Sequence, residues 1–270
     1  MRILICGDVV GRSGRKAIAQ HLPKLRDRYQ VDFVIINGEN AAGGFGITPK
    51  ICDEFFEAGA DAITTGNHVW DQREIIPHLD KEPRILRPAN FPKGTPGKGI
   101  SRLADAQGRG VVVVQLMARL FMDPLDDPFA AVENMLETWR LGSNAQAIVL
   151  DFHGEASSEK MAMGHFLDGR VSVVVGTHTH IPTADAQIFP SGTGYITDIG
   201  MCGDYDSVIG IRKEISVERF VRKMPTARME AAQGEATLCA ILVDTDDKTG
   251  LTTHIRPVRI GGRLRREEPG

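Results

Sequence analysis

The amino-acid sequence predicts an α/β fold in which two β-sheets pack face to face with helices outside, giving αββα layers. Through the first two thirds of the chain, short β-branched apolar runs alternate with longer amphipathic stretches, as in strand–helix–strand units. Short strands then dominate from residue 185 onward. No repeat or linker-like segment divides the chain, so we expect one domain over residues 1–260 and a polar C-terminal tail over residues 261–270.

Continuous apolar runs closed by Gly, Asn or Asp predict the strands of the first part of the chain. These strands are expected at Ile3–Cys6, Val31–Asn37, Ala62–Thr65 and Ile85–Ala89. A helix is expected at Arg15–Tyr29, although Pro23 should kink or interrupt it. A second helix is expected at Lys50–Ala58, because Thr48 and Pro49 form a typical helix start. This order predicts parallel strands joined by right-handed crossovers.

A loop-like segment, Pro88–Gly99, precedes a second set of alternating elements. Strands are expected at Val111–Met117, Ala147–Phe152 and Val171–Gly176, with helices at Phe129–Leu141 and Ser157–Leu167. The last third is predicted to contain the strands Gln187–Phe189, Tyr195–Asp198, Thr237–Val243 and Thr252–Val258, and one helix at Glu214–Lys223.

Composition excludes several classes of protein. The 270 residues include 32 Lys and Arg against 35 Asp and Glu, a net charge of −3, so broad nucleic-acid binding is not expected. No apolar run approaches the roughly 20 residues that a membrane span needs, and no secretion signal is visible. The four cysteines stand apart without disulfide-like or metal-like spacing, which indicates reduced thiols and a cytoplasmic protein.

Polar side chains follow five of the predicted strands, where ligands bind in α/β sheets. They are Asp8, Glu39, Asn40, Asn67, His68, His153, His178 and His180. Taken singly, Asp8 has the ordinary role of a cap or turn residue, and Asn67 that of a turn former. Together, these carboxylates, imidazoles and amides form a set that suits iron, manganese or zinc, so the sequence predicts a metal centre.

The spacing of these residues fits two ions. In extended backbone, His178 and His180 would point to the same side while Thr179 turns away. Either Asp8 or Glu39 could bridge two ions, since a carboxylate has two oxygens. Two metals roughly 3.5–4 Å apart are the usual clamp for phosphoryl chemistry.

The same motifs resemble the calcineurin-like metallophosphoesterases, through Gly66-Asn67-His68 and the Gly-x-His-x-His element at 176–180. Several further segments are similar to the YmdB-type branch of that superfamily. They are Asn37–Ala41, Asp151–His153, Ala156–Lys160, Thr177–Asp185 and Thr197–Met201. The resemblance covers nearly the whole chain.

The resemblance implies a metallophosphoesterase-like sandwich and two iron or manganese ions, with zinc or magnesium as substitutes after heterologous expression. It implies hydrolysis of a small phosphodiester, with 2′,3′- or 3′,5′-cyclic mononucleotides as substrates, by a metal-bound hydroxide. On this sequence, Asp8 and His180 would bind the first ion, and Asn40 would add an oxygen to it. The second ion would be bound by Asn67, His153 and His178. Glu39 would bridge the two ions, and His68 would donate the proton. The wider superfamily has His where this chain has Val10 and Asp where it has Glu39, and the closer branch shares both changes.

Other interpretations stay open. The metal site could serve a regulatory protein that acts through a partner or an RNA. A nucleotide-cofactor oxidoreductase is a weaker alternative: Gly7, Gly11 and Gly14 follow the first strand, but no Tyr-x-x-x-Lys pair is present. The Gly11–Gly14 loop is either a phosphate cradle or a tight strand-to-helix turn. A homo-oligomer is also left open.

Overall fold

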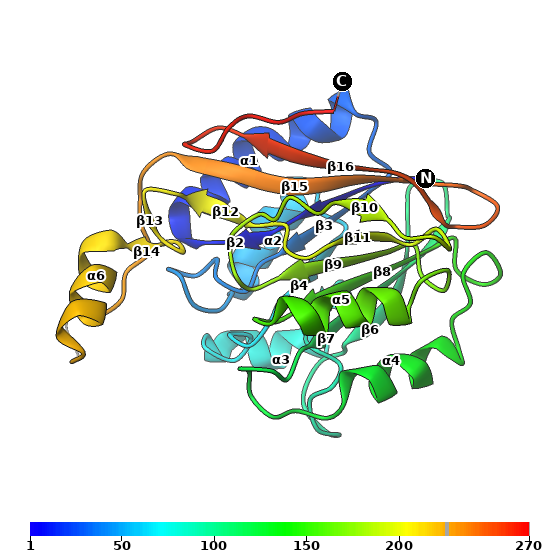
Figure 1. Cartoon of the computed structure of the whole chain (residues 1–270), viewed down its shortest axis with the longest axis horizontal. Coiled ribbons are helices and arrows are strands. Elements are labelled where there is room, and N and C mark those ends of the chain that lie inside the picture. Colours follow the sequence, from blue (N-terminus) through cyan, green and yellow to red (C-terminus); the bar gives the residue numbers. More distant parts are fainter. Residues whose placement is uncertain (225–226, 270) are drawn as a thin grey trace.

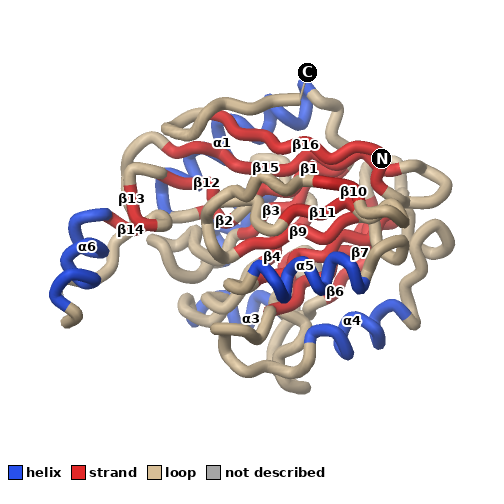
Figure 2. The backbone as a smooth tube through the Cα atoms, viewed as in Figure 1, coloured by secondary structure: helices blue, strands red, loops and turns tan. Residues whose placement is uncertain are grey.

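The computed structural model describes residues 1–224 and 227–269. Two large sheets lie face to face, with helices on both outer faces (Figures 1 and 2), which confirms the predicted fold class. A small hairpin and one helix protrude at one end of this sandwich.

The larger sheet has eight strands. In spatial order it contains β2 (Asp8–Val9), β12 (Met201–Asp204), β15 (Ala236–Thr245), β1 (Arg2–Cys6), β3 (Phe33–Asn37), β4 (Ala62–Thr64) and β5 (Ile85–Leu86), while β16 (Thr252–Ile260) pairs with β15. Of these strands, β1, β3, β4 and β5 are parallel and form one half of the sheet. Strand β1 is parallel to β3 on one side and antiparallel to β15 on the other. The first strand of the chain is therefore held by a strand near the C-terminus.

The smaller sheet has six strands. Its order is β10 (Gln187–Ile188), β11 (Gly194–Ile196), β9 (Val173–Thr177), β8 (Ala147–His153), β7 (Gly110–Met117) and β6 (Ile100–Ala104). The four middle strands are parallel, whereas β10 and β6 are antiparallel edges. Because β7, β8 and β9 are buried on both faces, they consist mainly of continuous apolar runs.

Three apolar layers hold the sandwich together. The layer between the sheets includes Ile5 of β1 and Val113 of β7. Helices α1 (Gly11–Arg28) and α2 (Pro49–Glu57) cover the outer face of the larger sheet. Helices α4 (Pro128–Leu136) and α5 (Ser157–Phe166) cover the smaller sheet. A 3-10 turn (Arg73–Ile75) and the short helix α3 (Ile76–Leu79) follow β4.

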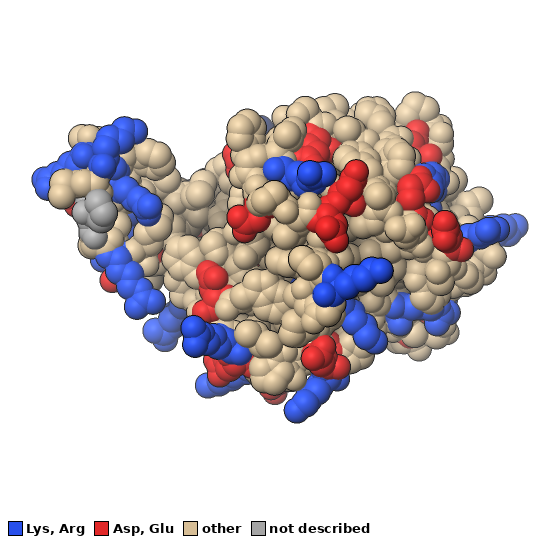
Figure 3. All heavy atoms as spheres, turned by 90° about the horizontal axis from the view of Figure 1, so that it is seen from below, with Lys and Arg blue, Asp and Glu red and all other residues tan. Residues whose placement is uncertain are grey.

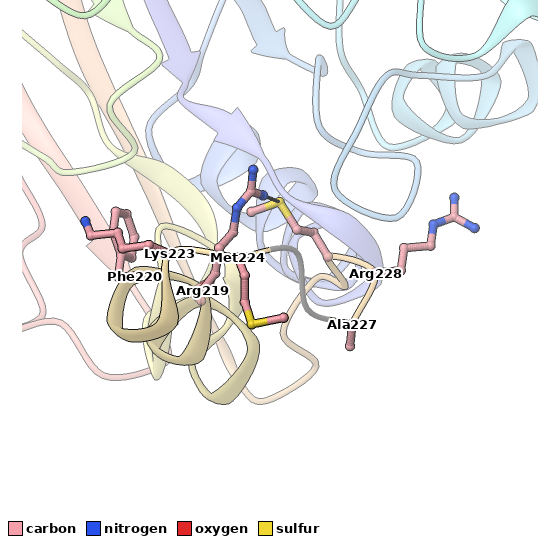
Figure 4. Close-up of a pocket in the computed structure, with 8 residues that line it drawn as sticks. Arg219, Phe220, Lys223, Met224, Ala227 and Arg228 are labelled. Atoms are coloured by element: carbon pink, nitrogen blue, oxygen red, sulfur yellow. Dashed lines mark hydrogen bonds between the residues drawn. The ribbon is translucent and has the colours of Figure 1, made fainter.

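The protruding part contains the hairpin β13 (Ser207–Val208) and β14 (Ile211–Arg212), followed by α6 (Lys213–Arg222). Figure 3 shows this part as a separate projection rich in Lys and Arg. Beside α6 lies a cavity of about 720 Å³ (Figure 4). It is lined by Ser216, Arg219, Phe220, Lys223, Met224, Ala227, Arg228 and Met229.

Two helix predictions were wrong in their details. Helix α1 begins at Gly11, earlier than expected, and continues through Pro23 without interruption. Burial of Leu22 and Leu25 against the larger sheet stabilises the helix on both sides of the proline and compensates for the hydrogen bond it cannot donate. Helix α4 ends at Leu136 with Glu137 as its C-cap, five residues before the expected end at Leu141.

The polar segment after β16 folds back over this strand. The backbone groups of Arg259 and Glu267 exchange hydrogen bonds of 2.7 and 3.0 Å, and the Tyr29 hydroxyl donates to the Pro269 carbonyl. Gly270, the last residue of the expected tail, lies outside the described residues. None of the helices in the described ranges is long and apolar enough to cross a membrane.

Candidate metal centre

The carboxyl ends of strands from both sheets meet at one edge of the sandwich, and the predicted ligand residues gather there. The larger sheet and its loops contribute Asp8, Glu39, Asn40 and Asn67, and the smaller sheet contributes His153, His178 and His180. Asp8, Glu39, Asn40, His153 and His180 are buried. Six of these seven residues supply the side-chain atoms of two overlapping clusters, and Asn40 borders them.

The first cluster surrounds the Nε2 atom of His153. Three other donor atoms lie close to it: Glu39 Oε2 at 3.1 Å, Asn67 Oδ1 at 3.0 Å and His178 Nδ1 at 3.1 Å. One imidazole nitrogen cannot form hydrogen bonds with all three. Adjacent ligands about 2.1 Å from one ion at right angles would lie about 3 Å apart, so these residues fit a metal ion.

The second cluster contains Asp8, Glu39 and His180, whose ligand atoms all lie within 4.8 Å of one another. Asp8 Oδ1 lies 4.0 Å from His180 Nε2. Asp8 Oδ1, Glu39 Oε2 and Asn40 Oδ1 are buried and accept no hydrogen bond from the described residues. Buried acceptors without partners are costly, and a cation would satisfy them. Glu39 belongs to both clusters.

Hydrogen bonds behind the clusters orient the two buried imidazoles. His180 Nδ1 lies 2.8 Å from the Ile209 carbonyl oxygen, and this hydrogen bond leaves Nε2 facing Asp8. His153 Nδ1 lies 2.9 Å from the Thr177 hydroxyl, which in turn donates to Asp151 at 2.6 Å. Such partners fix the tautomer that a metal ligand needs.

A glycine keeps the first cluster open. A Cβ atom added to Gly66 would overlap Glu39 Oε2 and lie 2.5 Å from His153 Nε2. An alanine at position 66 would fill the space between the donor atoms, which explains why the Gly-Asn-His motif begins with a glycine.

The backbone around His178 and His180 differs from the prediction. Strand β9 ends at Thr177, and the two histidines have φ values of +100° and +66°, so the expectation of extended backbone was wrong. The rings also face different clusters: His178 Nδ1 lies beside His153, whereas His180 Nε2 faces Asp8.

Burial and neighbouring charges shift the pKa values of His153, Glu39 and His178, the titratable residues of the first cluster. Burial lowers the pKa of His153, but the Glu39 and Asp8 carboxylates outweigh it and raise that pKa to about 9. Burial raises the pKa of Glu39, yet His153 lowers it to about 2. Burial, with His153 beside it, lowers the pKa of His178 to about 3. The carboxylates thus favour a positive charge within the cluster.

A cavity of about 250 Å³ opens over the clusters, and His68 lies on its wall. His68 Nδ1 lies 2.8 Å from Asp71 Oδ2, its ring contacts Phe45 edge to face, and its side chain is 28% exposed. Glu155 also lines the cavity, with Oε2 3.4 Å from His178 Nε2.

Sequence reasoning missed three residues at or beside this cavity. Asp71, three positions after His68, and Glu155, two after His153, had a weak signal in their proximity to predicted site residues. Phe45 had none.

The Gly11–Gly14 loop does not form a phosphate cradle. The Gly11 amide donates to the Asn40 carbonyl and the Gly14 amide to the Val10 carbonyl. A Cβ at Gly14 would collide with the Cys202 carbonyl, and none of residues 11–14 lines the cavity of the metal centre. The alternative interpretation, a tight strand-to-helix turn, is confirmed.

Comparisons with known proteins agree over the whole chain. The family model described as YmdB-like protein matches residues 4–258. The 2′,3′-cyclic-nucleotide 2′-phosphodiesterase of Bacillus subtilis is 47% identical over 260 residues, which are 96% of this chain and 97% of that protein.

Solved structures agree as well. A hypothetical protein of Thermus thermophilus has a TM-score of 0.90 and 45% identity, over 97% of this chain and all of that one. A Mycoplasma pneumoniae structure described as a novel phosphatase has a TM-score of 0.90 and 30% identity, over 100% of this chain and 95% of that one.

Proposed function

Because the chain belongs to the YmdB-like protein family, we propose that it is a metal-dependent phosphodiesterase acting on 2′,3′-cyclic mononucleotides. The resemblance predicted from the sequence is thereby confirmed. The prediction of an enzyme is confirmed as well, since its relatives include a phosphodiesterase and a phosphatase. The observation that carries the proposal is the pair of clusters sharing Glu39 at the strand ends.

In this proposal Glu39, which belongs to both clusters, would be the residue common to the two ion sites. Asp8 and His180 hold the first ion, with an oxygen from Asn40, whose Oδ1 is buried and free of hydrogen bonds to the described residues. Asn67, His153 and His178 hold the second. Imidazole, carboxylate and amide ligands together suit iron or manganese, and zinc or magnesium could substitute.

Two metal ions, when bound, neutralise the phosphate charge and activate water for attack on phosphorus. The chain itself supplies the proton for the leaving oxygen. His68 lies on the cavity wall, outside both clusters, and Asp71 holds its Nδ1 atom so that Nε2 remains available. Cleavage of a phosphodiester needs such a general acid because the departing ribose oxygen is a poor leaving group.

The proposal is tested by metal analysis coupled to substrate hydrolysis. Purified protein should contain close to two equivalents of iron or manganese, and hydrolyse 2′,3′-cyclic AMP faster than 3′,5′-cyclic AMP and p-nitrophenyl phosphate. EDTA and the Asp8→Asn variant should both abolish hydrolysis. Preference for the monoester, or hydrolysis that survives both treatments, would refute the proposal.

The Asp8→Asn variant also separates an enzymatic from a regulatory role. The protein should fold, since the shape of the side chain is kept, while the charge at the first ion is lost. A cellular phenotype that is indifferent to this substitution would favour a regulatory protein acting through a partner.

A further inference from the structure

A buried ion pair lies directly behind the turn that carries His178 and His180. Lys160 of α5 has a side chain that is 1% exposed, and its Nζ lies 2.9 Å from Oδ2 of Asp198, whose side chain is fully buried. Neither residue lines the cavity or faces the ligand clusters. The proposed phosphodiesterase reaction therefore gives no role to the buried charges of Lys160 and Asp198.

The two ends of this ion pair hold the peptide groups on both sides of His178. Lys160 Nζ donates to the Thr177 carbonyl at 2.8 Å, which belongs to the peptide group before His178. The Thr179 amide, in the peptide group after His178, donates to Asp198 Oδ2 at 3.1 Å. The other carboxylate oxygen of Asp198 accepts the Gly200 amide at 2.9 Å.

The backbone at this turn needs such support. His178 and His180 have φ values of +100° and +66°, a region that residues with a side chain rarely adopt. Unfavourable backbone of this kind persists where surrounding contacts over-determine it. Besides the ion pair, the peptide group before His178 has two longer contacts, from the His178 amide to Asp8 Oδ2 at 3.2 Å and from the Gly154 amide to the Thr177 carbonyl at 3.3 Å.

The cost of burying these charges argues for a positioning role. A buried ion pair is often no more stabilising than well-packed apolar residues of the same volume, because both ions lose their hydration. A Cβ at Gly176 would collide with the Thr197 carbonyl and would also lie 2.9 Å from Lys160 Cδ, so a glycine here leaves room for both the neighbouring backbone and the lysine.

We propose that Lys160, through its ion pair with Asp198, is a positioning residue that holds the turn at residues 177–180 in the conformation that aims His178 and His180 at the metal clusters. This inference rests on the proposed function, which assigns those histidines to the two ions. It predicts that loss of the lysine charge alters the turn even before any metal is bound.

The first arm of the test measures hydrogen exchange in metal-free protein. Lys160→Met keeps the length and most of the volume of the side chain and removes its charge. Amide exchange in the peptide covering residues 177–180 should accelerate at least about tenfold. The matched control is Arg170→Met, which removes another ion pair of the same layer, Arg170 with Glu133, and should leave this peptide unchanged. Unchanged exchange in Lys160→Met would overturn the inference.

The second arm measures Mn²⁺ binding by calorimetry. Loss of a residue that orients metal ligands typically lowers metal affinity about 10–100-fold, and we expect a loss of this size in Lys160→Met. Wild-type affinity in this variant would overturn the inference. If the wild-type protein itself bound no Mn²⁺, the proposed metal centre would fail, and the exchange arm would still decide whether Lys160 holds the turn.

A double variant distinguishes positioning from a purely structural role. Lys160→Met combined with Asp198→Asn leaves no unpaired buried charge, so the melting temperature should recover relative to Lys160→Met alone. Mn²⁺ affinity should stay low, because the Thr177 carbonyl still lacks the shorter of its two hydrogen bonds, the one from Lys160. Recovery of affinity together with the melting temperature would show that Lys160 acts only on stability. The double variant also keeps the test available if Lys160→Met fails to fold.

Discussion

The two halves of the metal centre differ in how closely their ligand atoms are packed. We call Glu39, Asn67, His153 and His178 the tight half, because three donor atoms lie 3.0–3.1 Å from His153 Nε2. We call Asp8, Glu39, Asn40 and His180 the open half, where Asp8 Oδ1 lies 4.0 Å from His180 Nε2. Ligands about 2.1 Å from one ion on opposite sides lie about 4.2 Å apart, so both halves are spaced to hold an ion, and the tight half has its donor atoms closer together.

The ligand types follow the same division. The tight half has two imidazoles, while the open half has one, and Val10, which lines the cavity beside Asn40, offers no ligand atom. Imidazole nitrogens bind transition metals more strongly than carbonyl or amide oxygens do. We therefore expect the two ions to bind with unequal affinity, the tight half filling first.

The largest effect should come from Glu39, the residue that the halves share. Glu39→Ala removes the charge between both ions, so metal content should fall from about two equivalents to near zero, with hydrolysis at background. Elemental analysis after gel filtration measures the metal content of the variant. Glu155→Ala removes an exposed carboxylate of the same cavity and should retain both ions. Retention of one tightly bound ion in Glu39→Ala would show that the halves are independent.

Separate removal of one imidazole from each half tests their inequality. His178→Ala should lose the ion of the tight half and His180→Ala that of the open half, so each variant should bind about one equivalent of Mn²⁺. The ion remaining in His180→Ala should bind at least about tenfold more tightly, or about 1.4 kcal/mol. Calorimetric titration of both variants measures the difference. Equal affinities would contradict the distinction between the halves.

His68 should affect catalysis without affecting either half. His68→Ala should keep both ions and lose about 10²–10⁴-fold in turnover, the usual contribution of a general acid. Asp71→Asn weakens only the contact that orients the His68 ring, so turnover should fall less, by about tenfold. Metal analysis and steady-state kinetics on the same preparations measure both. Loss of an ion in His68→Ala would make His68 a ligand instead.

The smallest effect should come from adding an imidazole to the open half. Val10 is buried and lines the cavity beside Asn40, so Val10→His could place a nitrogen near the first ion. We expect the affinity of the weaker Mn²⁺ site to rise by about tenfold, with the stronger site unchanged. Calorimetric titration fitted to two sites gives the Mn²⁺ affinity of each site. A lower affinity of the stronger site in Val10→His would mean that the two halves cannot be altered separately.

The gathering of the candidate ligand residues could be predicted because they follow apolar strands whose carboxyl ends meet at one edge of the fold. Asp8, Asn67 and His153 each come directly after such a run or close it. The turn at His178 and His180 could not be predicted, because its left-handed backbone depends on contacts with Lys160 and Asp198. Both residues lie in segments that resemble the YmdB-type branch, but pairing of their charges is a tertiary contact that those segments do not reveal.

The same contrast applies to the fold. The buried strands β7, β8 and β9 were predicted because burial on both faces leaves a continuous apolar run. Strand β6 was missed because it is an edge strand with exposed residues, and β2 because it has only two residues. Short elements of this kind are defined by their partners, which a single sequence does not reveal.

The pairing of β1 with β15 also bears on the order in which the molecule is completed during synthesis. The six-stranded sheet uses only residues 100–196, so it can form while the ribosome is still adding the remainder. Strand β1 leaves the ribosome before that sheet but finds its antiparallel neighbour only when residues 240–244 emerge. Because Asp8 follows β1 and His153 ends β8, the candidate site is complete only when both sheets have formed. The larger sheet is therefore completed only after β15 has emerged, whereas the six-stranded sheet does not depend on that strand.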